Sequence, residues 1–455
     1  MYVRRRHQPF SSESLAEILR DLPGVSRFWL AYSGGGDSHV LLHATAGLRE
    51  AGAVTALDVV HVDHGLQAAS AEWAQHCATV CGELDLPFTL LQVNARAGSG
   101  ESPEAAARAA RYRALAGLMR AGDCLLTAHH QDDQAETLLL QLLRGGGPHG
   151  LAAMPAVSAF AGGLHARPLL GFPRDELRRY AERHALRWID DPSNADGGFD
   201  RNYLRNAVMP VLRERWPAAA RVLARGAAHQ AEAAHLLDVL AAEDLRRCEA
   251  TGRRLRIGAL LELDAARQRN VLRFWLKQLG FKLPDTVRLA QLQGELLQAA
   301  ADRSPEVAWE GAVVRRYRDH LYVSPPHDPV DSAAVLPWGL ERALPLPDGS
   351  NLVAVPARGA GVKHALCRPG AVTVRYRRGG ETCRIARHGA NRPLKKLLQE
   401  IGMPPWERDH LPLIYIDEQL AAVPGYWVCT PCQAGADEAG LVFEWRRAAR
   451  DGTDQ

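Results

Sequence analysis

The stretch LAYSGGGDSHVLLH, residues 30–43, contains the residue types that bind phosphate. Consecutive glycines allow positive φ angles and let bare amides approach a ligand closely. Serine hydroxyls add donors, and a helix that begins near residue 37 or 38 adds unpaired N–H groups and its positive dipole end. We therefore predict a phosphate-binding loop. It consists of Ser33, Gly34, Gly35, Gly36, Asp37 and Ser38.

This loop differs from the lysine-containing phosphate loop of many nucleotide-binding proteins. That motif is G-x-x-x-x-G-K-[ST], and the chain contains no Gly-Lys pair. The first lysine of the chain is Lys277, so the positive charge of the first half is arginine. Chemistry that needs a phosphate-binding or Schiff-base lysine from this half is therefore excluded.

Short apolar runs alternate with helical patterns throughout the first half. We expect strands at 28–32, 54–64, 88–95 and 124–130, and helices directly after the glycine loop and at 70–86, 103–121 and 132–145. Repeated β-α units of this length predict an α/β fold with a doubly wound, Rossmann-like parallel sheet covered on both faces. Ligands bind beyond the carboxyl ends of such strands, where the glycine loop falls.

The second half of the sequence differs in composition and in the spacing of its apolar residues. Alanine and leucine recur at helical spacing after residue 201, which predicts a mostly helical domain over 216–325 that follows a catalytic domain over 1–215. Proline-rich and polar sequence predicts a linker over 326–365. A small basic α+β domain is expected over 366–445.

Composition places the chain among ordinary globular proteins, with 47% hydrophobic residues and a formal net charge of +3. The eight cysteines show no disulfide-dense framework, which fits a reducing cytoplasm. Cys429 and Cys432 form a C-x-x-C motif without a second pair, so we interpret them as an incidental pair. There is no signal-peptide pattern and no apolar run of membrane-spanning length, which predicts a cytoplasmic protein with no membrane partner.

Several motifs in register resemble the tRNA(Ile)-lysidine synthetase family of the N-type ATP pyrophosphatases. SGGGDS (33–38) is similar to the S-G-G-x-D-S loop of that superfamily. The closer resemblance lies in HVDHGL (61–66), LLTAHHQDDQAETLLLQLLRGGGPHGLAAMP (125–155), DPSNADGGFDRNYLRNAVMPVL (191–212) and LKKLLQEIGMPPWERDHLPLIY (394–415). These stretches span most of the chain.

The resemblance implies a reaction. ATP, with Mg²⁺, adenylates the C2 oxygen of the wobble cytidine in a tRNA(Ile) with a CAU anticodon. The ε-amino group of free L-lysine then attacks C2, AMP leaves, and lysidine results. Asp37 is implied to lie near the triphosphate with magnesium, the alternative being a helix cap. The metal ligands stay unassigned, and a homodimer is compatible with the resemblance.

Arg108 and Arg111 lie three residues apart, on one face of their expected helix. Arginine guanidinium groups suit phosphate oxygens or a lysine carboxylate. A solvated helix face is the alternative for each. Because the domain has no lysine to offset the triphosphate charge, we assign a functional role to at least one of them.

Acidic residues open the helix that follows TAHH. A lysine amine has an unperturbed pKa of about 10.4, so exposing the neutral amine near pH 7 costs roughly 4 to 5 kcal/mol. Carboxylates bind the ammonium, and a desolvated base can accept its proton. We assign Asp133 and Glu136 to lysine, Asp132 to the nucleotide, and His130 to a nucleotide or proton-transfer contact. Complementing the helix dipole is the alternative for any one of these acids.

The C-terminal part carries a local excess of positive charge that predicts contacts with tRNA phosphates. Its cations are Arg375, Arg377, Arg378, Arg384, Arg387, Arg392, Lys395, Lys396 and Arg408, against Glu381, Glu400 and Glu407. Arg201 and Arg205 either position the anticodon or hold domains together, and the sequence does not separate these.

Other functions remain as alternatives. An amidating ATP pyrophosphatase would lack the basic C-terminal domain and would need an ammonia source. A thiolating tRNA enzyme would need cysteines close to the glycine loop, which this chain does not place there. A catalytically inactive tRNA-binding protein would not need the intact loop.

Overall fold

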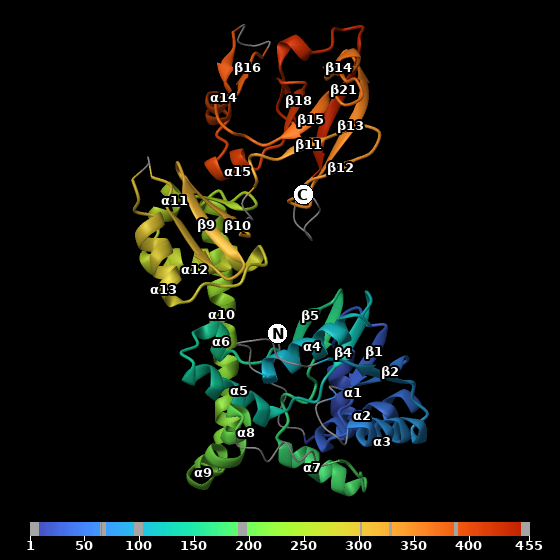
Figure 1. The fold of residues 1–455 in the computed structure, drawn as a ribbon. Coiled ribbons are helices and arrows are strands. Elements are labelled where there is room, and N and C mark those ends of the chain that lie inside the picture. Colours follow the sequence, from blue (N-terminus) through green and yellow to red (C-terminus); the bar gives the residue numbers. More distant parts are fainter. Residues whose placement is uncertain are drawn as a thin grey trace. The chain divides into compact units, whose positions relative to one another are not determined.

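The computed structural model describes residues 9–63, 65, 70–94, 103–189, 198–300, 303–326, 330–385 and 390–446, with side chains described from residue 106 in the segment that begins at 103. The chain divides into two compact units, Met1–Leu237 and Asp238–Gln455. Figure 1 shows the elements of both units, and each unit is treated by itself below.

A six-stranded sheet forms the centre of the first unit, with strand order β3-β2-β1-β4-β6-β5. Neighbouring strands are parallel except for the pair of β5 and β6. The strands are β1 (Arg27–Ala31), β2 (Leu57–Asp63), β3 (Phe88–Gln92), β4 (Asp123–Leu126), β5 (Val157–Phe160) and β6 (Gly163–Ala166). The predicted parallel sheet is confirmed, and β5 and β6 extend it beyond the four expected strands.

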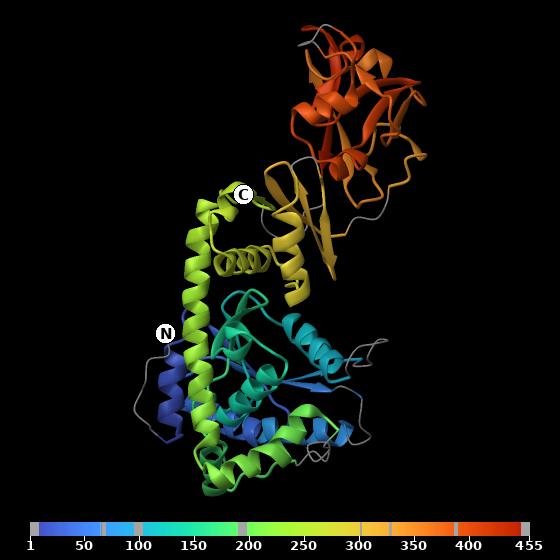
Figure 2. The same cartoon turned by 90° about the vertical axis from the view of Figure 1, so that its left-hand side faces the viewer.

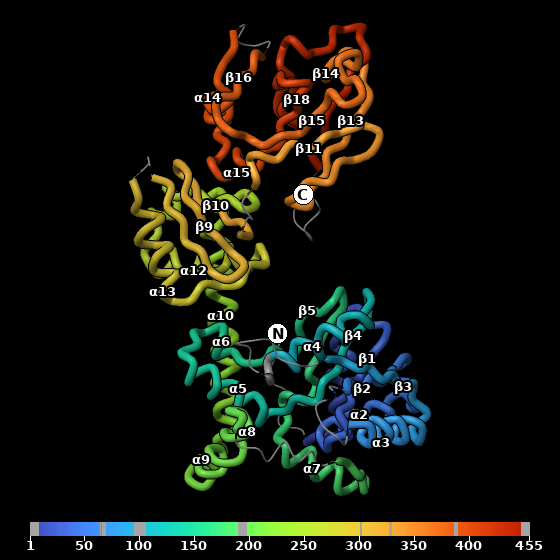
Figure 3. Tube along the Cα trace, in the orientation of Figure 1, coloured from blue at the N-terminus to red at the C-terminus, as the bar shows by residue number. Residues whose placement is uncertain are grey.

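Helices cover both faces of this sheet, because alternate strand residues feed two separate cores. Leu30 of β1 packs in the larger core with residues of α1 (Ser12–Arg20), α2 (Gly36–Glu50), α3 (Ser70–Glu83) and α7 (Arg174–Arg183). Trp29, the preceding residue, packs on the opposite face with Leu115 of α4 (Pro103–Ala116). The sheet is therefore doubly wound, as the trace in Figure 3 also shows.

Three further elements complete the site-bearing part of this unit. The helix α5 (Gln131–Leu143) begins five residues after β4 ends and is followed by the short α6 (Pro148–Leu151). Later in the chain, α8 (Asp200–Tyr203), the π-helix η2 (Leu204–Val208) and α9 (Met209–Arg215) form one nearly continuous helical stretch. This stretch brings arginines to the first turns of α5, as described below.

The middle segment combines the predicted helices with a sheet that we did not predict. Its helices are α10 (Ala219–Arg247), which is long and continuous in Figure 2, α11 (Ile257–Leu261), α12 (Ala265–Gln278), α13 (Thr286–Gln291) and the π-helix η3 (Leu292–Leu296). Its strands are β7 (Arg254–Arg256), β8 (Glu306–Trp309), β9 (Ala312–Tyr317) and β10 (His320–Ser324), in the antiparallel order β7-β10-β9-β8. The sheet buries alternate apolar residues against α12 and α13.

The C-terminal part is α+β, as predicted, and starts earlier than predicted. The expected linker 326–365 contributes β11 (Val335–Pro337), β12 (Leu344–Pro345), β13 (Asn351–Arg358) and β14 (Val362–Lys363). Strand β13 pairs along its whole length with β21 (Ala439–Arg446), at the other end of the domain. Such pairing between strands far apart in the sequence leaves no local signal. The prolines of this segment also argue against strands, because proline cannot donate a backbone hydrogen bond to a sheet.

The remaining C-terminal elements complete two sheets and a small ribbon. The sheets have the orders β11-β15-β18-β19-β20 and β12-β13-β21-β14, and β16 pairs with β17. The elements are β15 (Val372–Arg375), the 3-10 turn η4 (His364–Leu366), β16 (Thr382–Cys383), β17 (Arg392–Pro393), α14 (Leu394–Glu400), α15 (Pro405–Asp409), β18 (Leu413–Ile416), β19 (Gln419–Val423), β20 (Trp427–Val428) and the 3-10 turn η5 (Thr430–Cys432).

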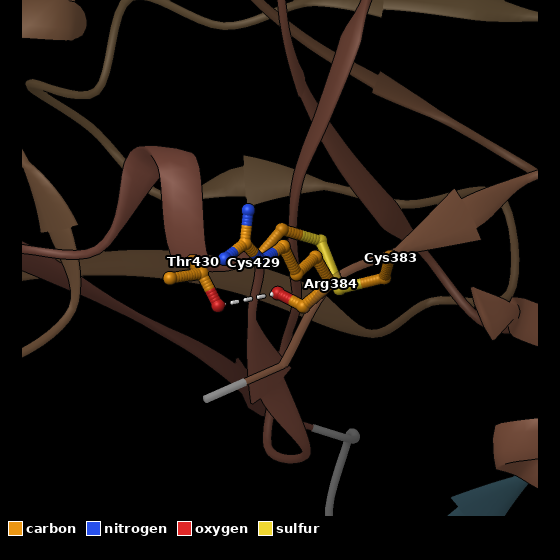
Figure 4. Close-up of a disulfide and its surroundings, with 4 residues drawn as sticks. All are labelled: Cys383, Arg384, Cys429 and Thr430. Atoms are coloured by element: carbon orange, nitrogen blue, oxygen red, sulfur yellow. Dashed lines mark hydrogen bonds between the residues drawn. A yellow bond between two sulfur atoms is a disulfide. The ribbon is translucent and has the colours of Figure 1, made fainter. Parts of the chain in front are cut away.

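Two of the cysteines form a disulfide that we did not predict. Cys429 forms a disulfide with Cys383, and both residues are buried in the core beside α14. The adjacent Thr430 hydroxyl donates a 2.7 Å hydrogen bond to the carbonyl oxygen of Arg384 (Figure 4). Cys432 is a free, buried thiol, so the C-x-x-C motif is not a bonded pair. Within the described part of the chain, no helix has the length and apolarity needed to cross a membrane.

Candidate functional site

The glycine loop connects β1 to α2 and has the conformation expected of a phosphate loop. Gly34 has a φ of +84°, Gly35 caps the helix in an extended conformation, and α2 begins at Gly36. The hydroxyl of Ser38 donates to the Gly35 carbonyl at 2.9 Å and lies 3.0 Å from the Ser33 hydroxyl. The serines therefore brace the loop, and the first amides of α2 remain available to an anion.

Two loop glycines lie close to neighbouring side chains, with different consequences. A Cβ at Gly34 would lie 3.2 Å from the Cys77 sulfur, in a backbone region that disfavours side chains. A Cβ at Gly36 would lie 3.3 Å from the indole of Trp188. Trp188 also lines the cavity beside this loop, a placement that we did not predict. No pattern around residue 188 indicates this role, because the contact arises only from the tertiary fold.

Replacing Gly34 with alanine is expected to cost about 1 to 3 kcal/mol of folding stability, because the residue would be held at positive φ against Cys77. Gly47→Ala is the matched control, since this exposed glycine lies inside α2 with open space where the added methyl group would lie. The control is expected to stabilise the protein by up to about 1 kcal/mol. Thermal unfolding of both variants measures the difference, and equal midpoints would contradict the assigned loop strain.

A cavity of about 850 Å³ lies at the carboxyl ends of β1, β2 and β4, next to the glycine loop. This is the position expected for the ligand of a doubly wound sheet. The predicted site residues that line it are Ser33, Gly35, Gly36, Asp37, Ser38, Arg111 and Asp132. The other predicted residues, Gly34, Arg108, His130, Asp133 and Glu136, do not line this cavity.

His130 is buried beside Asp37 of the loop, whereas His129, the preceding residue, lines the cavity. The His130 side chain is 2% exposed, and its Nε2 lies 3.4 Å from Asp37 Oδ2 and 3.5 Å from Asp133 Oδ2. Its Nδ1 accepts the Asp133 amide, which caps α5. His129 lines the cavity. The structure therefore places His129 at the cavity in place of the predicted His130, because the chain turns into α5 at residue 130.

Surrounding carboxylates control the charge of His130. Burial by itself lowers the pKa of this histidine, but Asp133, Asp37 and Asp132 outweigh burial and raise the pKa above its usual value. Burial likewise raises the pKa of Asp133, while His130 and Arg201 outweigh it and hold that pKa well below its ordinary value. The neighbouring carboxylates therefore favour an ion pair between a protonated His130 and Asp133, in which Nδ1 no longer accepts the Asp133 amide because an imidazolium group has no acceptor.

This ion pair predicts a pH dependence of stability. A raised histidine pKa stabilises the fold fully below its unfolded value, about 6.5, and this contribution is lost as pH rises through the raised pKa. Without nucleotide or magnesium, the melting temperature is expected to fall from pH 6 to pH 9. His130→Asn, which keeps a capping acceptor, is expected to lack this component of the slope. Identical slopes for the two proteins would contradict a charged His130.

Asp133 and Glu136 are held by two arginines from the α8–η2 stretch. Arg201 donates to Asp133 Oδ1 and to Glu136 Oε2, both at 3.0 Å. Arg205 donates to Asp133 Oδ1 at 2.8 Å and to Glu136 Oε1 at 2.8 Å. The remaining Asp133 oxygen accepts the His130 amide at 2.9 Å. The structure thus joins Arg201 and Arg205 to the first turns of α5, within the first unit.

Arg108 and Arg111 both contact Tyr112. Their guanidinium carbons lie 4.9 Å and 5.6 Å from the centre of its ring, within cation–π range. Arg111 and Tyr112 line the cavity, whereas Arg108 is exposed outside it. Arg111 is therefore the better placed of the two for a ligand in this cavity.

The cavity is also lined by arginines that we did not assign to the site from the sequence. They are Arg174, Arg178, Arg205 and Arg213. Arg174 Nε lies 3.9 Å from Asp37 Oδ2, and Arg213 forms an ion pair with Asp132. The absence of lysine from this half was the available signal, because it required arginine to supply any charge for phosphate. The sequence singled out Arg205 only for a contact with the anticodon or between domains, and nothing in it distinguished the other three from the remaining arginines.

The glycine loop, the cationic cavity and the doubly wound sheet together define a nucleotide-binding enzyme domain. Residues 8–212 match the family model described as a PP-loop domain. Residues 255–322 match the TilS substrate binding domain, and residues 372–445 match the TilS substrate C-terminal domain.

Relatives that match along nearly the whole chain define the family more narrowly. The chain is 43% identical over 436 residues to the tRNA(Ile)-lysidine synthase of Coxiella burnetii, with 96% of each chain covered. It is 44% identical over 414 residues to the enzyme of that name from Alkalilimnicola ehrlichii, with 91% of this chain and 92% of the relative covered. The chain therefore belongs to the tRNA(Ile)-lysidine synthase family.

Proposed function

We propose that this protein uses ATP to attach free L-lysine to C2 of the wobble cytidine of a tRNA(Ile) with a CAU anticodon, through an adenylated cytidine. The products are lysidine, AMP and diphosphate. The observation that carries this proposal is the match to lysidine synthases along nearly the whole chain, which includes the intact glycine loop. We place the reaction in the cytoplasm.

The cavity suits ATP with Mg²⁺. The start of α2 and the side chains of Arg174, Arg178 and Arg213 line the cavity, and their amides and guanidinium groups are suited to phosphate oxygens. Asp37 supplies a carboxylate oxygen, the kind of ligand that Mg²⁺ takes together with phosphates and water. When bound, the ion offsets the charge that develops on the phosphates. Among the described residues no cluster of three or more His, Cys, Asp or Glu could hold a metal ion by itself.

For lysine, we propose the carboxylates of Asp133 and Glu136. Both are buried acids that can bind an ammonium group, and a base in a desolvated site can then accept its proton. In this structure Arg201 and Arg205 occupy their oxygens. Binding of lysine at these acids therefore requires an exchange of cations, in which at least one guanidinium group turns away.

For tRNA, we propose contacts with a narrower set of C-terminal cations than the sequence predicted. Several members of the predicted cluster are engaged within the protein: Arg375 with Glu418, Arg377 with Asp409, Arg392 with Glu400, Arg378 with backbone carbonyls, and the buried Arg408 with Met403. Arg387 lies outside the described residues. Arg384, Lys395 and Lys396 are exposed without an ion-pair partner among the described residues, so they suit phosphates. A homodimer stays a prediction.

The experiment follows labelled lysine into purified tRNA(Ile) with a CAU anticodon, together with AMP release. Methionine tRNA with the same anticodon is the control substrate. We expect incorporation into the first tRNA alone. AMP release without incorporation of lysine would retain the ATP pyrophosphatase chemistry and refute lysine as the nucleophile.

A further inference from the structure

A chain of hydrogen bonds leads from the buried Arg167 to His129 at the cavity. Arg167 is 6% exposed, and its Nη2 lies 3.1 Å from His165 Nδ1. His165 Nε2 lies 2.9 Å from the Thr127 hydroxyl oxygen, and that oxygen lies 2.9 Å from His129 Nδ1. A 2.7 Å bond from Arg167 Nη1 to the Pro155 carbonyl anchors the far end. The four side chains therefore form one connected relay.

The arginine fixes the direction of every bond in this relay. A guanidinium group only donates, so His165 Nδ1 must accept and a neutral His165 carries its proton on Nε2. That proton is donated to the Thr127 oxygen. Among the described residues the Thr127 hydroxyl has no acceptor other than His129, so its own proton is directed to His129 Nδ1. A neutral His129 consequently carries its proton on Nε2.

Both histidines are neutral near pH 7. Burial lowers the pKa of His129 to about 3, despite the nearby Asp133, and Arg201 and Arg167 lower it further. Burial, followed by Arg167, lowers the pKa of His165 to about 3. The pKa of His129 is therefore shifted in the opposite direction from the pKa of its neighbour His130, which carboxylates raise.

The second nitrogen of His129 is free to meet a ligand. His129 lines the cavity together with Thr127, and its Nε2 has no hydrogen-bond partner in the part of the chain that the structure describes. Because Nε2 carries the proton, it can donate and cannot accept. Such a group selects an acceptor, and among the ligands of the proposed reaction the phosphate oxygens are the strongest acceptors.

We propose that His129 acts as a neutral hydrogen-bond donor with a fixed tautomer to a phosphate oxygen of the nucleotide, and that Arg167, His165 and Thr127 are its positioning residues. The assignment rests on the proposed function for the identity of the ligand. It gives the reaction a donor that adds no charge to the cavity and needs no rearrangement as charge develops on the phosphate.

The test cuts the relay at Thr127. Thr127→Val keeps the shape and removes the hydroxyl, whereas Thr127→Ser keeps the hydroxyl. Loss of one oriented hydrogen bond is expected to lower kcat for AMP release about tenfold in the valine variant, with the KM for tRNA unchanged and the serine variant close to wild type. Thr45→Val is the matched control, because Thr45 is also buried in this unit and its hydroxyl bonds only to the Leu41 carbonyl.

A second readout follows the tautomer itself. Histidine-selective ¹⁵N NMR of the full chain, with His129 assigned by its loss in His129→Gln, is expected to show protonation at Nε2 in the wild type. The valine variant is expected to show a mixture of tautomers, which a merely structural role of Thr127 would not produce. The glutamine variant, whose amide NH₂ lies near the Nε2 position, is expected to retain more activity than His129→Asn.

Two results would overturn the proposal: a charged or Nδ1-protonated His129 in the wild type, or equal kcat values for the valine and serine variants. Failure of the proposed function looks different. In that case the wild type forms no lysidine, while the tautomer of His129 is still observed at Nε2.

Discussion

Asp37→Asn is expected to lower the rate of lysidine formation by at least about 100-fold, with the fold intact. The substitution keeps the shape of the side chain and removes the charge that we propose for magnesium and the triphosphate. Removing one preorganised electrostatic contact from an active site costs about 100-fold to 1000-fold in kcat. Among the acids that line the cavity, Asp37 is the one in the first turn of α2, beside the loop amides.

The surroundings of Asp37 explain why the fold does not depend on its charge. Its side chain is 33% exposed and lies 3.4 Å from His130 Nε2, whose stronger partner is Asp133. Loss of the Asp37 charge therefore leaves His130 paired and costs little stability. AMP release and lysine incorporation are measured on the same sample, with the melting temperature as the check on folding.

A matched control separates charge in the cavity from charge in general. Asp58→Asn removes a carboxylate from β2 that lies 3.6 Å from Arg27, outside the cavity. We expect the control to retain activity within about twofold, since surface ion pairs contribute roughly 0 to 1 kcal/mol. Full activity of Asp37→Asn at saturating magnesium would contradict the role assigned to this carboxylate.

The parts of the site that local sequence encodes were predictable. The glycine loop follows a buried strand and precedes a helix, so its residues alone indicate where the phosphate-binding amides lie. The alternation of strands and helices was equally local and predicted the doubly wound sheet. The histidine pair shows the limit, because whether residue 129 or 130 faces the cavity depends on where α5 begins within one residue.

Long-range features were not predictable in the same way. The ion pairs of Asp133 and Glu136 join residues that are 65 to 72 positions apart in the chain. No periodicity relates such positions, so the sequence offered two uses for Arg201 and Arg205 and could not choose. The sheet of the middle segment was missed for a different reason. Its alternating apolar residues are interrupted by arginines, such as the buried Arg316, whose charged group binds the carbonyls of Leu296 and Leu297.

The second prediction with a large expected effect concerns the buried cluster of Asp133, Glu136, Arg201 and Arg205. Glu136→Gln is expected to destabilise the first unit by about 3 to 5 kcal/mol, because it leaves Arg201 and Arg205 short of a buried partner. In a unit of this size such a loss lowers the melting temperature by roughly 10 °C. Glu50→Gln, an exposed residue at the end of α2, is the matched control and is expected to leave the melting temperature within about 1 °C.

A double substitution shows whether Glu136→Gln loses stability through the broken ion pair or through a packing defect. Adding Arg205→Gln to Glu136→Gln removes both charges of one ion pair and is expected to recover part of the stability. The coupling energy between the two positions is expected to be at least about 1 kcal/mol, since the residues share two hydrogen-bonded oxygens. Strictly additive losses would contradict the ion pair.

The same variant decides whether the acids also bind lysine. If the ammonium exchanges with a guanidinium group at Glu136, the KM for lysine rises at least tenfold in Glu136→Gln, while the KM for ATP stays within about twofold. Because the assay is run below the melting temperature of the variant, lost stability does not imitate this selective change. If the KM for lysine is unchanged while the melting temperature falls, Asp133 and Glu136 serve only to orient Arg205 into the cavity. The ammonium must then meet one of the carboxylates that line the cavity, Asp37, Asp63, Asp132 or Asp175.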